Sequence, residues 1–169
     1  MELFKDQYRG AKEELTPPHM SPDTCGVPVN TTAYADASHA ENRVTRRSHN
    51  GFIMCINRSP IIWYSKKQNT VEASTFSSEF IAMKACVEEI TALWFKLRMF
   101  GVTVYEQTKL LCDNESVVKN SLILDSTLNK KHISIAYHSV RWNVASGLIQ
   151  ESWIDTNYTL ADAMTNILT

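Results

Sequence analysis

Three segments near the start of the chain have the pattern of β-strands. Residues 31–38 alternate, with Asp36 on one face and three alanines on the other, and small alanines favour close packing of a helix. Residues 51–57 and 61–67 are rich in apolar and β-branched side chains, and Arg58, Ser59 and Pro60 between them predict a tight turn. The three segments together predict an antiparallel meander.

A long amphipathic helix is predicted over residues 77–100, ending at Gly101. Apolar residues recur at helical spacing along one side, and this stripe consists of Met83, Cys86, Val87, Ile90, Leu93, Trp94 and Leu97. Glu79 falls on the same stripe, one turn before its first member. A carboxylate on a buried helix face needs a partner, which can be a cap, a basic group or a metal.

The second half of the chain predicts two further strands and three helices. One strand covers residues 109–114, with Asp113 near its end, and the other covers residues 148–154. A short helix begins near Glu115, a second helix covers residues 131–145, and a third covers residues 160–168. Each of these strands follows a helix, so we expect both to run parallel to the first strand. The predicted fold class is α/β, with a mixed five-stranded sheet of three antiparallel and two parallel strands flanked by helices. Such crossovers favour a site at the carboxyl ends of the parallel strands.

Composition divides the chain into an arm and one domain. The 169 residues are 44% hydrophobic, enough for a single core. Residues 1–30 hold four of the five prolines and predict a linker arm, and residues 31–169 form the domain. No apolar run is long enough for a membrane span, and residues 1–10 have no apolar signal region. We therefore expect no membrane partner and no secretion.

The formal net charge of −1 argues weakly against a nucleic-acid partner. The basic residues nevertheless cluster, and the clusters are Arg43 with Arg46 and Arg47, Lys66 with Lys67, and Lys130 with Lys131. Acids committed to metal ions would leave a basic excess, which is compatible with a phosphate-binding face. Each cluster taken alone is more typical of solvated surface.

Neither the four cysteines nor His132 and His138, which are six residues apart and fall on different faces of a helix, predict a zinc site. Cys25, Cys55, Cys86 and Cys112 are far apart and form no CxxC pair, and three of them lie in apolar runs. We expect buried free thiols.

Four acids occupy positions that a sheet of this kind would bring together. Asp36 and Asp113 lie near the carboxyl ends of two strands expected to be parallel neighbours, while Glu79 and Asp162 lie on helices. Four carboxylates cannot share a small space without cations, and oxygen ligands select Mg²⁺ or Mn²⁺. Two such ions about 4 Å apart are a known device for cleaving phosphodiesters. Taken singly, each acid can also be a solvated charge, and Asp162 a helix cap.

Five sequence blocks carry a resemblance to a known family. They are YADASHAENRVTRRSHNGF, IIWYSKKQNTVEASTFSSEFIAMK, LLCDNESVVK, KKHISIAYHSVR and LADAMT, in this order across residues 31–168. Together they resemble the ribonuclease H domain of copia-type retrotransposon polyproteins (Pseudoviridae-like, with long terminal repeats). The preceding EELTPPHMSPDTCGVPV resembles the connector from the reverse transcriptase, which would make the chain a fragment.

The resemblance implies a metal-dependent endonuclease that hydrolyses the RNA strand of RNA–DNA hybrids during reverse transcription, giving 5′-phosphate products. Asp36, Glu79, Asp113 and Asp162 match the four catalytic acids, which would bind two Mg²⁺ or Mn²⁺ ions. Asp36 and Asp113 would contact both ions, Glu79 the ion near the leaving group, and Asp162 the ion that activates water. The implied partners are the hybrid and the polymerase part of the same polyprotein, in a cytoplasmic virus-like particle.

The chain also departs from the wider ribonuclease H pattern, and its substrate contacts are less well defined. The segment before Asp162 is short and lacks the usual His, with Asn157 near that place. Predicted hybrid contacts are Lys66, Lys67, Thr75, Ser77, Ser78 and Asn114. Trp63 and Trp94 are expected in the core, and Trp142 is a candidate for stacking.

Two other functional hypotheses stay open on the sequence. One is a non-catalytic nucleic-acid-binding or tethering module with this fold, and the other is an integrase-like nuclease. A long helix between the second and third acids fits ribonuclease H better than an integrase, whose final Glu follows the second Asp on a later helix.

Overall fold

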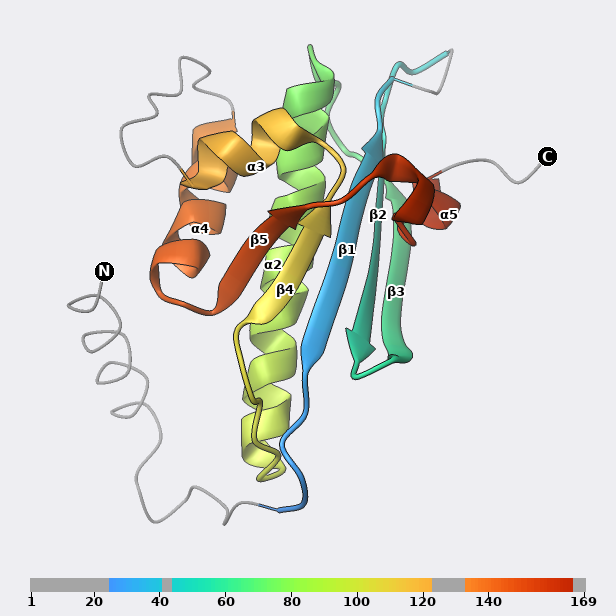
Figure 1. Ribbon diagram of the computed structural model, residues 1–169. Coiled ribbons are helices and arrows are strands. Elements are labelled where there is room, and N and C mark those ends of the chain that lie inside the picture. The colour runs from blue at the N-terminus through green and yellow to red at the C-terminus, as the bar shows by residue number, and fades with distance from the viewer. Residues whose placement is uncertain (1–24, 41–43, 123–132, 166–169) are drawn as a thin grey trace.

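The computed structural model describes residues 25–40, 44–122 and 133–165. Five strands form one sheet in the order β3-β2-β1-β4-β5 (Figure 1). Their bounds are β1 Thr31–Ser38, β2 His49–Ile56, β3 Ser59–Lys67, β4 Thr108–Cys112 and β5 Ile149–Trp153. The first three strands pair antiparallel, while β4 pairs parallel with both β1 and β5. This confirms the mixed sheet predicted from the sequence.

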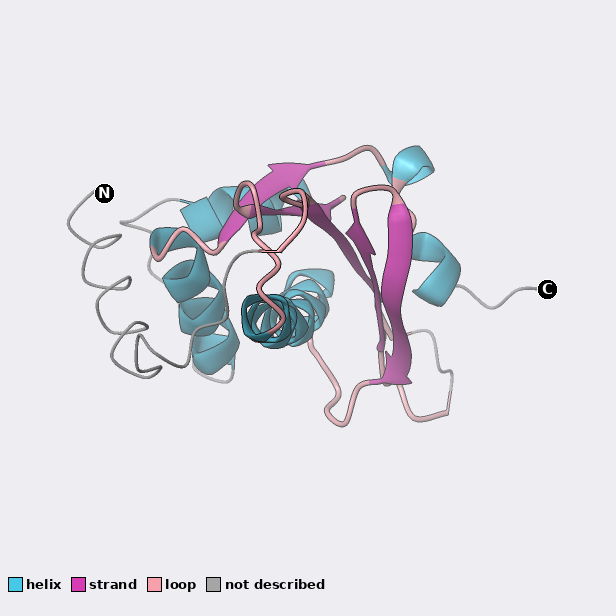
Figure 2. Ribbon diagram, turned by 90° about the horizontal axis from the view of Figure 1, so that it is seen from below, coloured by secondary structure: helices cyan, strands magenta, loops and turns pink. Residues whose placement is uncertain are grey.

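Helices cover the two faces of the sheet unequally. Their bounds are α2 Thr75–Met99, α3 Glu115–Leu122, α4 Ser134–Ala145, the 3₁₀ turn η3 Thr156–Tyr158 and α5 Asp162–Thr165. The long α2 runs along one face with α3 and α4 beside it, whereas α5 lies on the opposite face against β1, β2 and β3 (Figures 1 and 2). No helix within the described ranges is both long and apolar enough to cross a membrane.

The order of the elements agrees with the sequence prediction, and most differences concern the residues at which single strands and helices begin or end. The strand predicted over 109–114 already ends at Cys112, because the Asn114 side chain caps α3 by accepting hydrogen bonds from the Ser116 and Val117 amides, at 3.1 and 3.3 Å. Of the helix predicted over 160–168, the described part is the single turn of α5, and residues 166–168 lie outside the described ranges.

The core lies between the sheet and α2. The predicted stripe of α2 is buried there except Trp94, which is partly buried and donates from Nε1 to Thr108 Oγ1 at 2.8 Å. Cys55, Cys86 and Cys112 are buried free thiols, as expected, while Cys25 is free and exposed. Cys86 and Cys112 belong to the same hydrophobic core cluster as the buried stripe of α2.

The core prediction for Trp63 was wrong. Its side chain is 67% exposed, because it lies on the edge strand β3 and faces away from α2. Its neighbour Tyr64 points the other way and stacks on the buried Phe52, with ring centroids 4.9 Å apart. A strand alternates between faces, so only one of the two aromatic residues can reach the core.

The described end of the predicted arm follows the segment after α2. The Cys25 amide donates to Gly101 O at 2.7 Å, and Val29 forms a parallel bridge with Val104 and packs against the core. Part of the segment before residue 30 therefore contacts the domain. The boundary between arm and domain at residue 30 stays a prediction.

Candidate active site

Asp36 and Asp113 meet at the carboxyl end of the parallel strands. Tyr34 of β1 pairs with Leu111 of β4, and each acid lies two residues further along its strand direction. Asp36 is 8% exposed and Asp113 is half-buried. The neighbouring parallel strands thus place both carboxylates at one edge, as the sequence predicted.

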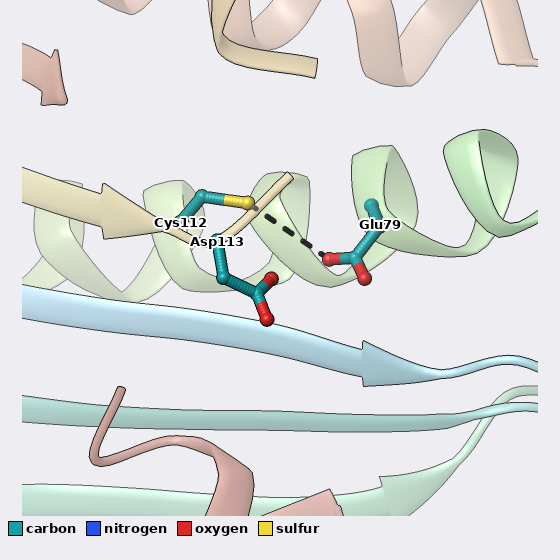
Figure 3. Close-up of side chains that lie close together, drawn as sticks. All are labelled: Glu79, Cys112 and Asp113. Atoms are coloured by element: carbon teal, nitrogen blue, oxygen red, sulfur yellow. Dashed lines mark hydrogen bonds between the residues drawn. The ribbon is translucent and has the colours of Figure 1, made fainter. Parts of the chain in front are cut away.

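Glu79 reaches this edge from the second turn of α2. The helix begins after Ser74, whose side chain accepts from the Ser77 amide at 3.3 Å, and Glu79 is 4% exposed. Ligand atoms of Glu79, Cys112 and Asp113 all lie within 4.8 Å of one another (Figure 3). The Cys112 thiol donates to Glu79 Oε2 at 3.9 Å. Helix and strand therefore converge on one cluster.

Asp162 approaches from the opposite face of the sheet, on α5. This turn packs against β2 where Gly51 pairs with Asp36, and Ser65 Oγ of β3 donates to Met164 O at 2.6 Å. Asp162 is half-buried and close enough for its charge to act on Asp36. Two helices on opposite faces thus bring acids to the same end of β1.

The carboxyl groups perturb one another. Burial, followed by the charges of Asp36 and Asp113, raises the pKa of Glu79 to about 9. Burial also raises the pKa of Asp36, with contributions from Asp113 and Asp162, while the hydrogen bond from Thr165 opposes the rise. Within the described ranges, no basic side chain forms an ion pair with Asp36, Glu79 or Asp113. An arrangement of hard oxygen ligands without a basic partner suits divalent cations.

Two of the predicted substrate contacts are enclosed. The side chains of Ser77 and Ser78 are fully buried. The Ser77 hydroxyl lies 3.0 Å from Ser74 Oγ, and the Ser78 hydroxyl lies 2.9 Å from Ser48 Oγ and 3.0 Å from His39 Nδ1. Neither side chain presents surface that a substrate can touch in this structure, and both hold the start of α2.

The other predicted contacts lie nearer the surface. Lys66 and Thr75 are exposed, Lys67 is half-buried at the end of β3, and Asn114 is the half-buried cap of α3. Their contact with a hybrid stays a prediction. Of the basic clusters, Arg46 and Arg47 are exposed, whereas Arg43, Lys130 and Lys131 lie outside the described residues.

Several residues that sequence reasoning missed hold the acids in place. Asp113 Oδ2 accepts from Thr156 Oγ1 at 3.1 Å, and Asp113 O accepts from Trp153 Nε1 at 2.9 Å. Asp36 Oδ2 accepts from the hydroxyl of Thr165. Thr165 stands three residues after Asp162, one helical turn away, and that spacing is the only signal the sequence contains for it.

The short segment before α5 is built around a turn. Asp155 Oδ1 accepts from the backbone amide and the side-chain amide of Asn157, at 2.9 and 2.8 Å. Asn157, which stands near the place of the missing His, is thereby tied to its own turn.

The chain has relatives among transposon polyproteins, although no protein-family model matches it. It is 30% identical over 145 residues to the retrovirus-related Pol polyprotein from transposon RE1 of Arabidopsis thaliana, covering 85% of this chain. It is also 30% identical over 139 residues to that from transposon TNT 1-94 of Nicotiana tabacum, covering 80% of the chain. In both cases the match spans 10% of the relative's length.

Solved structures with a similar fold include ribonucleases H and a protease-reverse transcriptase. Ribonuclease H1 of Halobacterium salinarum gives a TM-score of 0.60 at 16% identity, covering 81% of this chain and 95% of that one. LC11-RNase H1 in complex with an RNA/DNA hybrid gives 0.63 at 13% identity, covering 81% and 94%. Prototype foamy virus protease-reverse transcriptase gives 0.57 at 12% identity, covering 86% and 22%. The chain is therefore a ribonuclease H-fold domain related in sequence to the Pol polyproteins of retrotransposons.

Proposed function

We propose that the chain is a metal-dependent endonuclease that hydrolyses the RNA strand of RNA–DNA hybrids. The observation that carries this is the convergence of Glu79 and Asp113, whose ligand atoms lie within 4.8 Å of each other, at the carboxyl end of the parallel strands. Asp36 is close enough for its charge to act on Glu79, and Asp162 is close enough to act on Asp36. A structural neighbour bound to an RNA/DNA hybrid and relatives that are Pol polyproteins support this substrate class.

The four carboxyl groups fit two divalent cations. Asp36 and Asp113 would bind both ions, Glu79 the ion near the leaving oxygen, and Asp162 the ion beside the attacking water. When bound, Mg²⁺ or Mn²⁺ ions supply a nucleophile at neutral pH and stabilise charge on the attacking and leaving oxygens. Without cations, burial and then the repulsion between these groups raise the pKa of Glu79 and of Asp36.

Side chains around the acids would hold them in the geometry that the reaction requires. Thr156 and Trp153 fix the Asp113 residue through its carboxylate and its carbonyl oxygen. Lys66, Lys67 and Thr75 are the proposed contacts to the hybrid backbone, and Asn114 stands beside the third acid. The 2′-hydroxyl would identify the RNA strand, and A-form shape would replace base readout.

The relatives support a biological setting for this activity. The chain spans about a tenth of the length of the curated relatives it matches. We infer that it works beside the polymerase part of a copia-type Pol polyprotein, which would contribute much of the affinity for the hybrid.

A cleavage assay tests the proposal. An RNA–DNA hybrid with 5′-labelled RNA is incubated with the protein in Mg²⁺, in Mn²⁺ and in EDTA, beside an RNA duplex of the same sequence. We expect metal-dependent cutting of the hybrid alone, no cutting by Asp113→Asn, and normal cutting by Glu106→Gln, which changes an exposed acid before the opposite end of β4. Absence of cutting by the wild type in either metal contradicts the proposal, and hybrid binding without cutting favours the non-catalytic module.

A further inference from the structure

The helix α5 is fixed on the sheet by close packing and by a hydrogen bond. A Cβ atom added to Gly51 would lie 2.6 Å from Thr165 Cγ2 and 2.9 Å from Met164 Cβ, so β2 and α5 touch where no side chain intervenes (Figure 1). From the neighbouring strand β3, Ser65 Oγ donates to Met164 O at 2.6 Å. The position of the whole turn relative to β1 is therefore well defined.

Thr165 uses this position to reach the first acid. Its hydroxyl donates to Asp36 Oδ2, and its other neighbouring acceptor, Asp162 O, is further away at 3.2 Å. The Thr165 side chain is 4% exposed and Asp36 is 8% exposed. Water is therefore nearly excluded from the bond, and loss of the hydroxyl would leave a buried carboxylate oxygen without this partner.

The bond restricts how Asp36 can present its oxygens. A carboxylate offers about four lone-pair sites, and Asp36 accepts from the Thr165 hydroxyl on Oδ2 and from the backbone amide of Ala37, which leaves the remaining sites for cations. Outer partners of this kind fix the orientation of metal-binding carboxylates. A freely rotating Asp36 would have to be ordered each time cations bind.

We propose that Thr165 is a positioning residue that orients Asp36 for cation binding, so that α5 contributes two functional groups, Asp162 and Thr165, one helical turn apart. This inference rests on the proposed function, because it assigns Asp36 to the cations. It extends that function to a residue outside the four acids.

Two substitutions isolate the hydroxyl. Thr165→Val keeps the branched shape that packs on Gly51 and removes the donor, whereas Thr165→Ser keeps the donor and removes the methyl group. The matched control is Thr159→Val, because the Thr159 hydroxyl is also buried and has no hydrogen-bond partner among the described residues. Thr165→Ala serves as a second variant without the donor, in case valine disturbs the packing.

The measurements are Mn²⁺ affinity by calorimetry and hybrid cleavage as a function of Mg²⁺, with thermal unfolding as a check on folding. We expect Thr165→Val and Thr165→Ala to weaken Mn²⁺ binding by roughly 10- to 100-fold, as outer partners of metal ligands do, and to raise the Mg²⁺ needed for cleavage. Thr165→Ser and Thr159→Val should stay within about threefold of the wild type, well below that range.

The outcomes separate this inference from the proposed function. A wild type that neither binds Mn²⁺ nor cuts the hybrid overturns both. A wild type that binds and cuts, with Thr165→Val or Thr165→Ala equal to it in metal affinity, overturns the role of Thr165 alone. A loss of affinity in the serine variant equal to that in the valine variant also overturns it, because the effect then follows the methyl group.

Discussion

Gly51→Ala is the sharpest test of how α5 is positioned. The φ angle of Gly51 lies outside the left-handed region, so alanine is sterically acceptable to the backbone there. The obstacle is the added Cβ, which would lie 2.6 Å from Thr165 Cγ2, 2.9 Å from Met164 Cβ and 3.1 Å from Ala161 O. Rotation of the Thr165 side chain would move Cγ2 away only by breaking the hydrogen bond to Asp36. No side-chain rotation moves Met164 Cβ or Ala161 O, so the turn itself must shift.

The magnitude follows from ordinary contact distances. Carbon atoms prefer separations of about 3.5–4.0 Å, so α5 must move by about 1 Å. Overpacking of this kind costs about 1–3 kcal/mol, of which lower chain entropy in the unfolded state returns about 0.4–1 kcal/mol. A displacement of about 1 Å at catalytic groups can lower the rate by about 100-fold. We therefore expect a modest loss of stability with a large loss of cleavage.

The assay is hybrid cleavage in Mg²⁺ beside urea unfolding, on Gly51→Ala and on the double variant Gly51→Ala/Thr165→Ser. The second change removes the methyl group nearest the new Cβ while keeping the hydroxyl, so it should recover part of the activity, about tenfold if a coupling of roughly 1.4 kcal/mol is restored. Cleavage by Gly51→Ala within threefold of the wild type would refute the reasoning. Equal activity of the single and double variants would show that the Thr165 contact is not responsible.

Three further predictions concern charge and burial. The pKa of Glu79 is raised from 4.5 to about 9 in the folded state, so this group should make the metal-free protein lose stability as the pH rises from 4.5 towards 9, by at most about 1.4 kcal/mol per pH unit. Urea unfolding in EDTA should show that Glu79→Gln makes the dependence on pH shallower, and that Mg²⁺ does the same for the wild type. The pKa of the buried Glu151 is raised to about 7, so Glu151→Gln should stabilise the protein above pH 7 without changing cleavage, and an activity loss would contradict this. Trp63→Lys should lower the free energy of unfolding by less than about 1 kcal/mol, because the side chain is exposed. Trp94→Phe should lower it by about 1 kcal/mol, because the hydrogen bond to Thr108 is lost; thermal unfolding measures both effects.

Local periodicity accounts for the part of the fold that the sequence predicted. Alternation over residues 31–38 and the stripe along α2 fixed the elements, and helices between the later strands implied the parallel pairing of β1 with β4. That pairing alone brings Asp36 beside Asp113, which explains why this half of the site followed from pattern. Glu79 followed because a carboxylate on a buried stripe requires a partner.

Contacts between distant segments account for what the sequence did not predict. The approach of α5 to Gly51 joins residues more than a hundred positions apart, and no local pattern marks a glycine that a helix will touch. Alternation also leaves open which face of an edge strand is covered, so it could not place Trp63 outside the core. The enclosure of Ser78 depends on His39 and Ser48, which contact its hydroxyl from the β1–β2 side.

The electrostatics of the site bear on whether the fold could serve as a binding module without turnover. A nucleic-acid backbone is negatively charged, and clustered carboxylates at the edge of the sheet would repel it. Burying Glu79 between Asp36 and Asp113 also costs stability at neutral pH, as its raised pKa shows. A module that only bound the hybrid would avoid both penalties with neutral side chains. Divalent cations remove both penalties at once, because they keep the acids ionised and turn a repulsive edge into one that attracts phosphate. The same cations that would let the hybrid bind at this edge are therefore those that would cleave it, and this favours the enzyme over the tether.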